Sequence, residues 1–176
     1  MIKIAVINGS ARENNMTGYA LNIVIKELRK HKDFEVITIE LKNFSLPIPG
    51  IKIKNDDSQK LRDLLKLADA YIIGTPEYNG SYTALIKLMI ENMGYPTAFK
   101  GKPIGLLGVA TGSLGAVKSL EHLRSVCSHI GGMVLPRVVS IAQIDKYFDA
   151  EGNCFDTKIE SEIAVAAKNL IDFLTK

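Results

Sequence analysis

A loop rich in hydroxyl and amide side chains follows the first apolar segment of the chain. It runs from Asn8 to Gly18, after the apolar run Ile2–Ile7, and leads into a segment with helical periodicity. The first turn of a helix presents unpaired N–H groups and the positive end of the helix dipole, which together bind anions. Arg12 adds a positive charge to the loop. The pattern is typical of a phosphate site, although a simple helix cap at Asn15 or Thr17 would explain it equally well.

Two further loops contain residue types that suit a ligand with a planar ring. The first, Gly74–Tyr82, combines Pro76 with the aromatic Tyr78, and the second, Ala110–Gly115, is rich in Gly, Ser and Thr. Proline and glycine give such loops fixed shapes with exposed backbone N–H groups, and tyrosine rings offer flat surfaces. Each loop alone could be a turn before a helix. Beside a phosphate site, the two loops indicate a phosphorylated molecule with a planar ring.

Several other kinds of site are excluded by motifs that the chain lacks. The patterns GxxxxGK[ST] and GxGxxG are absent, which argues against P-loop and Rossmann dinucleotide sites. There is no GxSxG elbow of an α/β-hydrolase, and Asn8–Ser10 stand where a receiver domain needs acidic residues. His31, His122 and His129 lie on polar helix faces or at helix ends. We therefore expect no metal site.

The elements that must position these loops alternate between strands and helices. The expected strands are short apolar runs bounded by Gly, Pro or Asn: Ile2–Ile7, Glu35–Leu41, Ala70–Gly74, Ile104–Ala110, and Met133–Leu135 continuing after Pro136. Helical periodicity falls in Leu21–Leu28, in Leu61–Ala68, from about Ser113 to Ile130, and from about Thr157 to Leu170. Strands that are apolar at every position are typical of parallel sheets covered on both faces. With right-handed crossovers, the pattern predicts an α/β fold: a doubly wound, five-stranded parallel sheet in flavodoxin-like order, with helices on both faces.

This arrangement explains where the three loops lie. In an open α/β sheet, ligands bind beyond the carboxyl ends of the strands. The loops follow the first, third and fourth predicted strands, so we expect them to meet at one edge of the sheet.

One helical segment, Thr83–Met93, is apolar on most of its circumference. Its residues form two stripes, one of Ala84, Leu85, Leu88 and Met89 and another of Ile86, Ile90 and Met93. One core cannot cover both stripes, and in a five-stranded sandwich the second would point away from the sheet. We therefore expect a subunit interface on this helix, with plain burial in the core of the chain as the alternative.

Composition and charge describe a globular protein without nucleic-acid or membrane partners. The 176 residues fit a single domain, 1–176, and 47% hydrophobic with 23% charged residues are enough to build a core. The net charge is only +3, and the one compact basic run, Arg29–Lys32, closes a predicted helix. The two cysteines make no disulfide framework, and the apolar start is too short for a signal peptide. We expect a cytoplasmic protein.

Together, the three loops resemble those of the NAD(P)H-dependent FMN reductases, the flavodoxin-like group that includes chromate and quinone reductases. The matching motifs are Gly9–Arg12, Pro76–Ser81 and Ala110–Gly115. The resemblance continues through Gly101–Pro103, Gly131–Gly132, Leu135–Pro136 and Phe148–Asn153. The Pro-Glu-Tyr-Asn-Gly-Ser segment at Pro76–Ser81 is its most specific part.

The resemblance implies an enzyme that holds FMN by these loops. NADPH or NADH would pass a hydride to the flavin, which then reduces a small-molecule acceptor such as a quinone, free flavin, azo compound or metal oxyanion. No side chain need act as a catalytic acid or base. The resemblance also implies a homodimer or dimer of dimers, for which we expect contacts through residues 83–93. The expected cofactor-binding residues are Ser10, Arg12, Asn15, Met16, Thr17, Pro76, Glu77, Tyr78, Asn79, Gly80, Ser81, Thr111, Gly112, Ser113 and Gly115.

Two alternative functions remain open at this point. A flavodoxin-type electron carrier would keep its FMN and exchange single electrons with partner proteins. Flavodoxins are typically strongly acidic with aromatic residues around the ring, whereas this chain has a net charge of +3 and no Trp. A flavin-binding regulatory protein would bind flavin without oxidising NAD(P)H directly.

Overall fold

The computed structural model describes residues 1–176 and contains one parallel β-sheet. Its strands are β1 (Ile2–Asn8), β2 (Phe34–Glu40), β3 (Ala70–Pro76), β4 (Pro103–Val109), β5 (Met133–Val134) and β6 (Val139–Ile141). Their order is β2-β1-β3-β4-β5, and β6 also pairs with β4. Because β5 and β6 pair with opposite ends of β4, they share the fifth position of the sheet. The predicted flavodoxin-like, five-stranded parallel sheet is confirmed.

The break between β5 and β6 falls at Pro136. Proline has no N–H to donate to a β-ladder, so a strand cannot continue through it with regular pairing. The Arg124 guanidinium, from the neighbouring helix, donates hydrogen bonds to the carbonyls of Leu135 and Pro136 at 3.0 and 2.8 Å. The carbonyl groups at the break are therefore satisfied by a side chain rather than by a strand.

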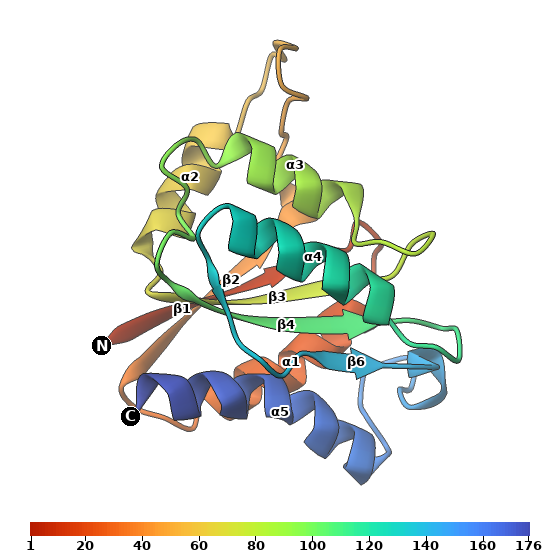
Figure 1. Cartoon of the computed structure of the whole chain (residues 1–176). Coiled ribbons are helices and arrows are strands. Elements are labelled where there is room, and N and C mark those ends of the chain that lie inside the picture. Colours follow the sequence, from red (N-terminus) through yellow and green to blue (C-terminus); the bar gives the residue numbers. More distant parts are fainter.

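Helices cover both faces of the sheet (Figure 1). One face carries α1 (Met16–Leu28) and α5 (Thr157–Leu174), and the other carries α2 (Ser58–Leu67), α3 (Ala84–Asn92) and α4 (Val117–His129). Each face has its own hydrophobic core. In β1, Ile4 and Val6 belong to the core with α1 and α5, whereas Ala5 and Ile7 belong to the opposite core. Burial on both faces explains why this strand is apolar at successive positions.

The structure corrects the prediction for the second stripe of Thr83–Met93. Ile86 and Met93 are 0% and 2% exposed, and Ile90 packs partly buried against the same core. The prediction that this stripe points away from the sheet was therefore wrong. The core that buries it also includes side chains from outside the sheet, such as Leu41, Leu61 and Phe99. The exposed positions of α3 are instead Ala84, Lys87 and Glu91, with Leu85 and Leu88 half-buried beside them.

Helix α4 begins at Val117 rather than near Ser113. Gly115 has a φ of +68°, which lies outside the right-handed helical region. The Ser140 hydroxyl accepts a hydrogen bond from the Ala116 N–H at 2.9 Å. The chain between β4 and α4 therefore stays a loop at the carboxyl edge of the sheet.

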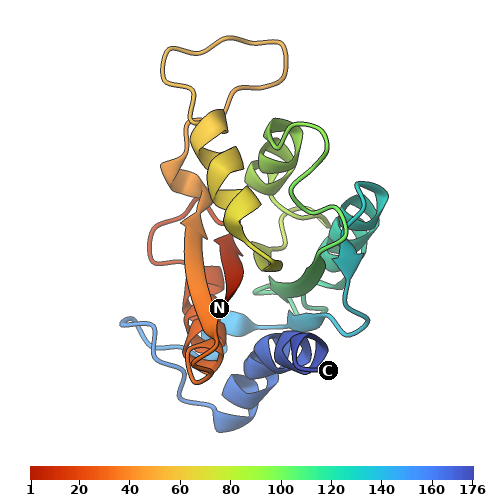
Figure 2. The ribbon, with the colours of Figure 1, turned by 90° about the vertical axis from the view of Figure 1, so that its left-hand side faces the viewer.

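An irregular segment, Phe44–Asp57, projects from the body beside α2 and α3 (Figures 1 and 2). We call it the projecting loop. Two backbone amides fasten its ends: Ser45 N–H donates to the Asp57 carboxylate and Asp57 N–H donates to the Ser45 carbonyl, both at 2.9 Å. Ile48 and Ile51, near its tip, are exposed.

The two edges of the sheet differ in what they carry. Both chain termini lie at the amino edge, and the loops after β1, β3 and β4 gather at the carboxyl edge (Figure 1). No helix combines the length and the apolar character needed to cross a lipid bilayer.

Candidate functional site

A cleft of about 390 Å³ opens at the carboxyl edge of the sheet. Its walls come from the loop after β1, the first residues after β3, the end of β4 and the turn after β6. The predicted binding residues in its lining are Ser10, Arg12, Asn15, Met16, Thr17, Pro76, Glu77, Tyr78 and Thr111. The structure thus brings the phosphate-type loop and the aromatic loop together, as the sequence predicts.

The N-terminus of α1 leaves polar groups free inside this cleft. Asn15 caps the helix, since its side-chain oxygen accepts from the Gly18 N–H at 2.7 Å. The N–H groups of Met16 and Thr17 have no acceptor in the chain. Thr17 as a whole is only 1% exposed and lines the cleft, and its hydroxyl makes no hydrogen bond within the chain. Free N–H groups at a helix N-terminus bind anions, so this end of the cleft suits an oxygen-rich ligand such as a phosphate.

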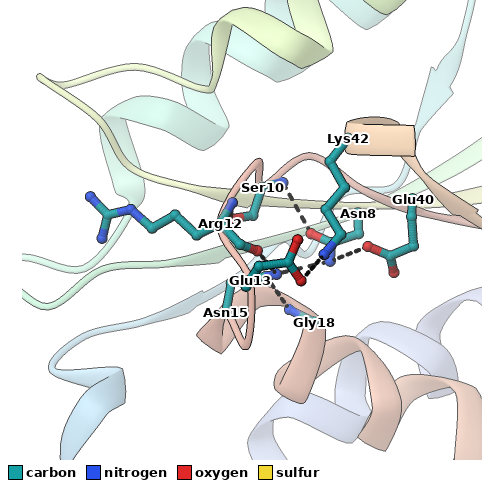
Figure 3. Close-up of polar contacts among 8 residues, drawn as sticks. All are labelled: Asn8, Ser10, Arg12, Glu13, Asn15, Gly18, Glu40 and Lys42. Atoms are coloured by element: carbon teal, nitrogen blue, oxygen red, sulfur yellow. Dashed lines mark hydrogen bonds and ion pairs between the residues drawn. The ribbon is translucent and has the colours of Figure 1, made fainter. Parts of the chain in front are cut away.

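Asn8, the last residue of β1, ties the loop to its surroundings (Figure 3). Its side-chain oxygen accepts from the Ser10 N–H at 3.0 Å, and its Nδ2 donates to Asn15 Oδ1 at 3.4 Å and to Glu40 Oε2 at 2.9 Å. The Ser10 hydroxyl in turn accepts from the Arg12 N–H at 3.3 Å. One buried amide therefore connects β2, the loop after β1, and the cap of α1.

Two charged groups at the end of β2 stand close to this loop. Burial raises the pKa of the Glu40 carboxyl above its usual value, and the hydrogen bond from Asn8 acts in the opposite direction. Lys42 Nζ lies 2.6 Å from the carboxylate of Glu13, which lines the cleft (Figure 3). The sequence analysis missed Asn8 and Glu40. Only the parallel register, which places Asn8 opposite Glu40, reveals them.

The aromatic side of the cleft depends on a tight turn. Tyr78 and Ser81 exchange backbone hydrogen bonds of 2.9 and 3.1 Å, and the residues between them, Asn79 and Gly80, have φ angles of 53° and 79°. Asn-Gly with both residues left-handed is the preferred two-residue hairpin turn. The Arg12 guanidinium carbon lies 5.1 Å from the centroid of the Tyr78 ring, a cation–π contact between the two loops.

Six predicted residues lie outside the lining of the cleft. They are Asn79, Gly80, Ser81, Gly112, Ser113 and Gly115. Asn79 and Gly80 form the turn just described, and the Ser81 hydroxyl lies 3.1 Å from Nδ1 of His122 on α4. These residues shape the loops next to the cleft in the structure.

The cleft also contains residues that the sequence analysis did not single out. These are Glu13, Asn14, Val109, Ala110, Ile144 and Asp145. Ile144 and Asp145 belong to the short helix η2 (Ile144–Lys146), which the backbone places there, because the Ile144 N–H donates to the Ala110 carbonyl at 3.1 Å. Their position depends on where the divided fifth strand ends, and no local motif marks it. No cluster of His, Cys, Asp or Glu suited to a metal ion is present.

Most of the chain is similar in sequence to known proteins. Residues 2–146 match the family model described as NADPH-dependent FMN reductase. An FMN-dependent NADPH-azoreductase of Staphylococcus aureus is 28% identical over 180 residues, which cover 97% of this chain and 92% of that protein.

Solved structures share the fold. FerB, a flavoenzyme NAD(P)H:(acceptor) oxidoreductase from Paracoccus denitrificans, aligns with a TM-score of 0.79 at 21% identity, covering 99% of this chain and 98% of that chain. The apo form of an NADH:FMN oxidoreductase aligns with a TM-score of 0.77 at 20% identity, covering 97% of this chain and 89% of that chain.

Proposed function

Because the chain belongs to the NADPH-dependent FMN reductase family, we propose that the cleft at the carboxyl edge of the sheet is its FMN site. The protein is an oxidoreductase that uses FMN and NADPH, and the family and cofactor expected from the motifs are confirmed.

The free N–H groups of Met16 and Thr17, at the start of α1, carry the assignment of the cleft. Both residues line the cleft, and the Thr17 hydroxyl also makes no hydrogen bond within the chain, so a phosphate bound there would give these donors a partner. A cleft of about 390 Å³ lies within the usual range for small-molecule sites. It offers one anion site, which fits the single phosphate of FMN better than the two of FAD.

In this proposal, the residues of the chain bind and orient FMN. Ser10, Arg12, Asn15, Met16 and Thr17 surround the phosphate, and Pro76, Glu77, Tyr78 and Thr111 face the ring. Asn79, Gly80 and Ser81 hold the aromatic loop, while Gly112, Ser113 and Gly115 shape the loop after β4. FMN, when bound, supplies the hydride chemistry, and no lining side chain need act as acid or base.

The electron acceptor that we propose is a small molecule, with azo compounds as the first choice. The Staphylococcus aureus relative is an FMN-dependent NADPH-azoreductase, and its similarity extends over nearly the whole of this chain. Quinones, free flavins and metal oxyanions form the rest of the acceptor panel.

Two measurements test this function. Flavin released from the purified protein by heat should chromatograph as FMN, in a ratio near one per chain, and stoichiometric FAD or no flavin uptake would contradict the proposal. Anaerobic addition of NADPH should bleach the bound flavin directly, and an azo dye should restore the colour. An electron carrier or a regulatory protein would stay yellow until a separate reductase was added. NADH tested in parallel measures the nucleotide preference.

We also propose a homodimer or dimer of dimers through residues 83–93. Leu85 and Leu88 of α3 are half-buried next to the exposed Lys87. The projecting loop, with its exposed Ile48, is fastened to the same helix by a 2.9 Å hydrogen bond from Asn92 to the Pro47 carbonyl. A second copy placed around a two-fold axis would cover both apolar regions with equivalent residues.

A further inference from the structure

Glu40 lies next to the proposed phosphate site without lining it. It is the last residue of β2, the edge strand, and the cleft is formed by loops from other strands. A carboxylate near an anion site is unexpected, because like charges repel at short range. Its position therefore calls for a role other than direct contact with the ligand.

The hydrogen bonds of Asn8 indicate that role. An amide side chain has two N–H donors on its nitrogen and an acceptor at its oxygen, so turning it by 180° exchanges donor and acceptor toward its neighbours. An ionised carboxylate can only accept, so Glu40 must face Nδ2 of Asn8, as it does at 2.9 Å. This orientation leaves the Asn8 oxygen for the Ser10 N–H at 3.0 Å.

The same orientation supports the helix cap. The second N–H of Asn8 Nδ2 points to Asn15 Oδ1 at 3.4 Å, and that oxygen also accepts from the Gly18 N–H at 2.7 Å. Asn8 is 2% exposed, so water cannot replace a lost partner. Loss of the Glu40 carboxylate would therefore weaken the hydrogen bonds of Asn8 with Ser10 and Asn15, which lie on either side of the free N–H groups.

We propose that Glu40 is a positioning residue of the FMN phosphate site, holding Asn8 in the one orientation that shapes the loop from Ser10 to Asn15 around the phosphate. This inference rests on the proposed function. The ion pair between Lys42 and Glu13 links the chain just beyond β2 to the outer side of the same loop. The end of β2 thus supports the loop at two points.

A comparison of two ligands tests the inference. Dissociation constants for FMN and for riboflavin, which lacks the phosphate, are measured by flavin fluorescence on the full chain freed of flavin. Glu40→Ala should weaken FMN binding about tenfold or more and riboflavin binding far less, because only FMN uses the loop's phosphate contacts. Glu40→Gln keeps an acceptor for Asn8 and should restore most of the FMN affinity. The matched control is Glu35→Ala, an exposed glutamate on the same strand, and it should bind both ligands like the wild type.

The possible results separate the inference from the function on which it rests. Failure of the wild type to bind FMN would overturn the proposed function and the inference together. If the wild type binds FMN, an equal loss of FMN and riboflavin affinity in Glu40→Ala would show a general structural effect and overturn the inference alone. Tighter FMN binding would show that repulsion dominates, and would also overturn it. If Glu40→Ala does not fold, Asn8→Leu removes the donor to Glu40 at similar size without adding a charge, and should show the same selective loss for FMN.

Discussion

Ser10 and Arg12 both belong to the phosphate-type loop, but their surroundings differ. Ser10 is almost fully buried and its hydroxyl still has a proton to donate, whereas Arg12 is exposed and rests against the Tyr78 ring. Ser10 is therefore already in place before a ligand arrives. Arg12 joins the phosphate loop to the aromatic loop.

Arg12→Ala and Ser10→Ala should each weaken FMN binding roughly ten- to a hundredfold while leaving the fold intact. Hydrogen bonds to a charged phosphate are worth about 1.5–3 kcal/mol each, and about 1.4 kcal/mol corresponds to a tenfold change. Titration of flavin fluorescence measures the loss, with circular dichroism as the check on folding. Arg29→Ala, an exposed arginine at the other end of α1, is the control. Unchanged affinity in both variants would place the phosphate elsewhere.

Glu40 should also make stability depend on pH. Burial raises its pKa above the usual 4.5, so the folded protein holds this proton more tightly than the unfolded chain. The stabilisation from this proton is complete below the unfolded value and is lost as the pH rises through the folded pKa. Glu40→Gln, which carries no titrating group there, should raise the free energy of unfolding above pH 7, and its advantage should shrink as the pH falls toward 4.5.

Urea denaturation of wild type and Glu40→Gln between pH 4.5 and 8 measures this difference. Two neighbouring charges also act on the pKa of Glu40: Lys42 lowers it and Glu13 raises it. Because salt screens such charges, both proteins should be measured at one constant salt concentration. A constant difference at all pH values would show that Glu40 does not titrate in this range.

At the residue scale, the sequence was sufficient for groups whose chemistry is local. Asn15 is one of the two helix caps that side-chain type and spacing allow, and the structure contains it. The loop after β3 contains a turn, as its composition allows, at Asn79 and Gly80. Asn8 and Glu40 are 32 residues apart and meet only because β1 and β2 pair in register. Register depends on the packing of the whole sheet, so no local pattern could predict their contact.

Among the elements, the close approach of the loop after β1 to α3 is the tightest junction near the cleft. A Cβ built on Gly9 would lie 2.4 Å from Cδ1 of Ile86 and 3.0 Å from the Gly74 carbonyl oxygen. The absence of a side chain at position 9 lets the phosphate-type loop, β3 and α3 pack against one another.

Gly9→Ala should therefore destabilise the protein by about 1–3 kcal/mol, because overpacking forces neighbouring atoms to shift. Adding Ile86→Ala should relieve part of the clash, so the double variant should be less destabilised than the sum of the single variants. Urea unfolding of all four proteins gives the coupling energy. Strict additivity would show that Gly9 and Ile86 do not constrain each other. Ile86→Ala should restore only part of the lost stability, because the added Cβ at position 9 would still lie close to the Gly74 carbonyl oxygen.

Element boundaries were predicted well where periodicity alone decides them and less well where distant contacts do. The four long strands were located to within a few residues, because β1, β3 and β4 are buried apolar runs and β2 is rich in β-branched residues. The start of α4 was placed too early, since Gly115 is left-handed and the next N–H, of Ala116, donates to Ser140 in the segment after Pro136. The same segment brings Asp145 to the cleft, and its path could not be derived from a broken strand pattern.

For the whole molecule, burial of Ile86 and Met93 changes which side chains can report on assembly. A charge at either position would disrupt the core of the single chain, so a loss of function there would say little about subunits. Leu88, half-buried on α3 beside Lys87, is the more informative position.

Leu88→Glu should shift the protein from dimer toward monomer in analytical ultracentrifugation, because the charge would be repeated across the two-fold axis and brought near its own copy. Leu67→Glu is the matched control, since Leu67 is an exposed leucine at the end of α2. It should leave the assembly unchanged. A monomeric wild type, or a Leu88→Glu variant that remains dimeric, would contradict an interface through residues 83–93.

Both chain ends lie at the amino edge of the sheet, opposite the cleft (Figure 1). A strand of seven residues such as β4 separates the two edges by about 20 Å. An affinity tag or a surface linker attached to Met1 or Lys176 would therefore leave the cleft facing the solution. The protein is thus suited to immobilisation on beads or sensor chips through either terminus, with dissolved dyes and nucleotides still able to reach the cleft.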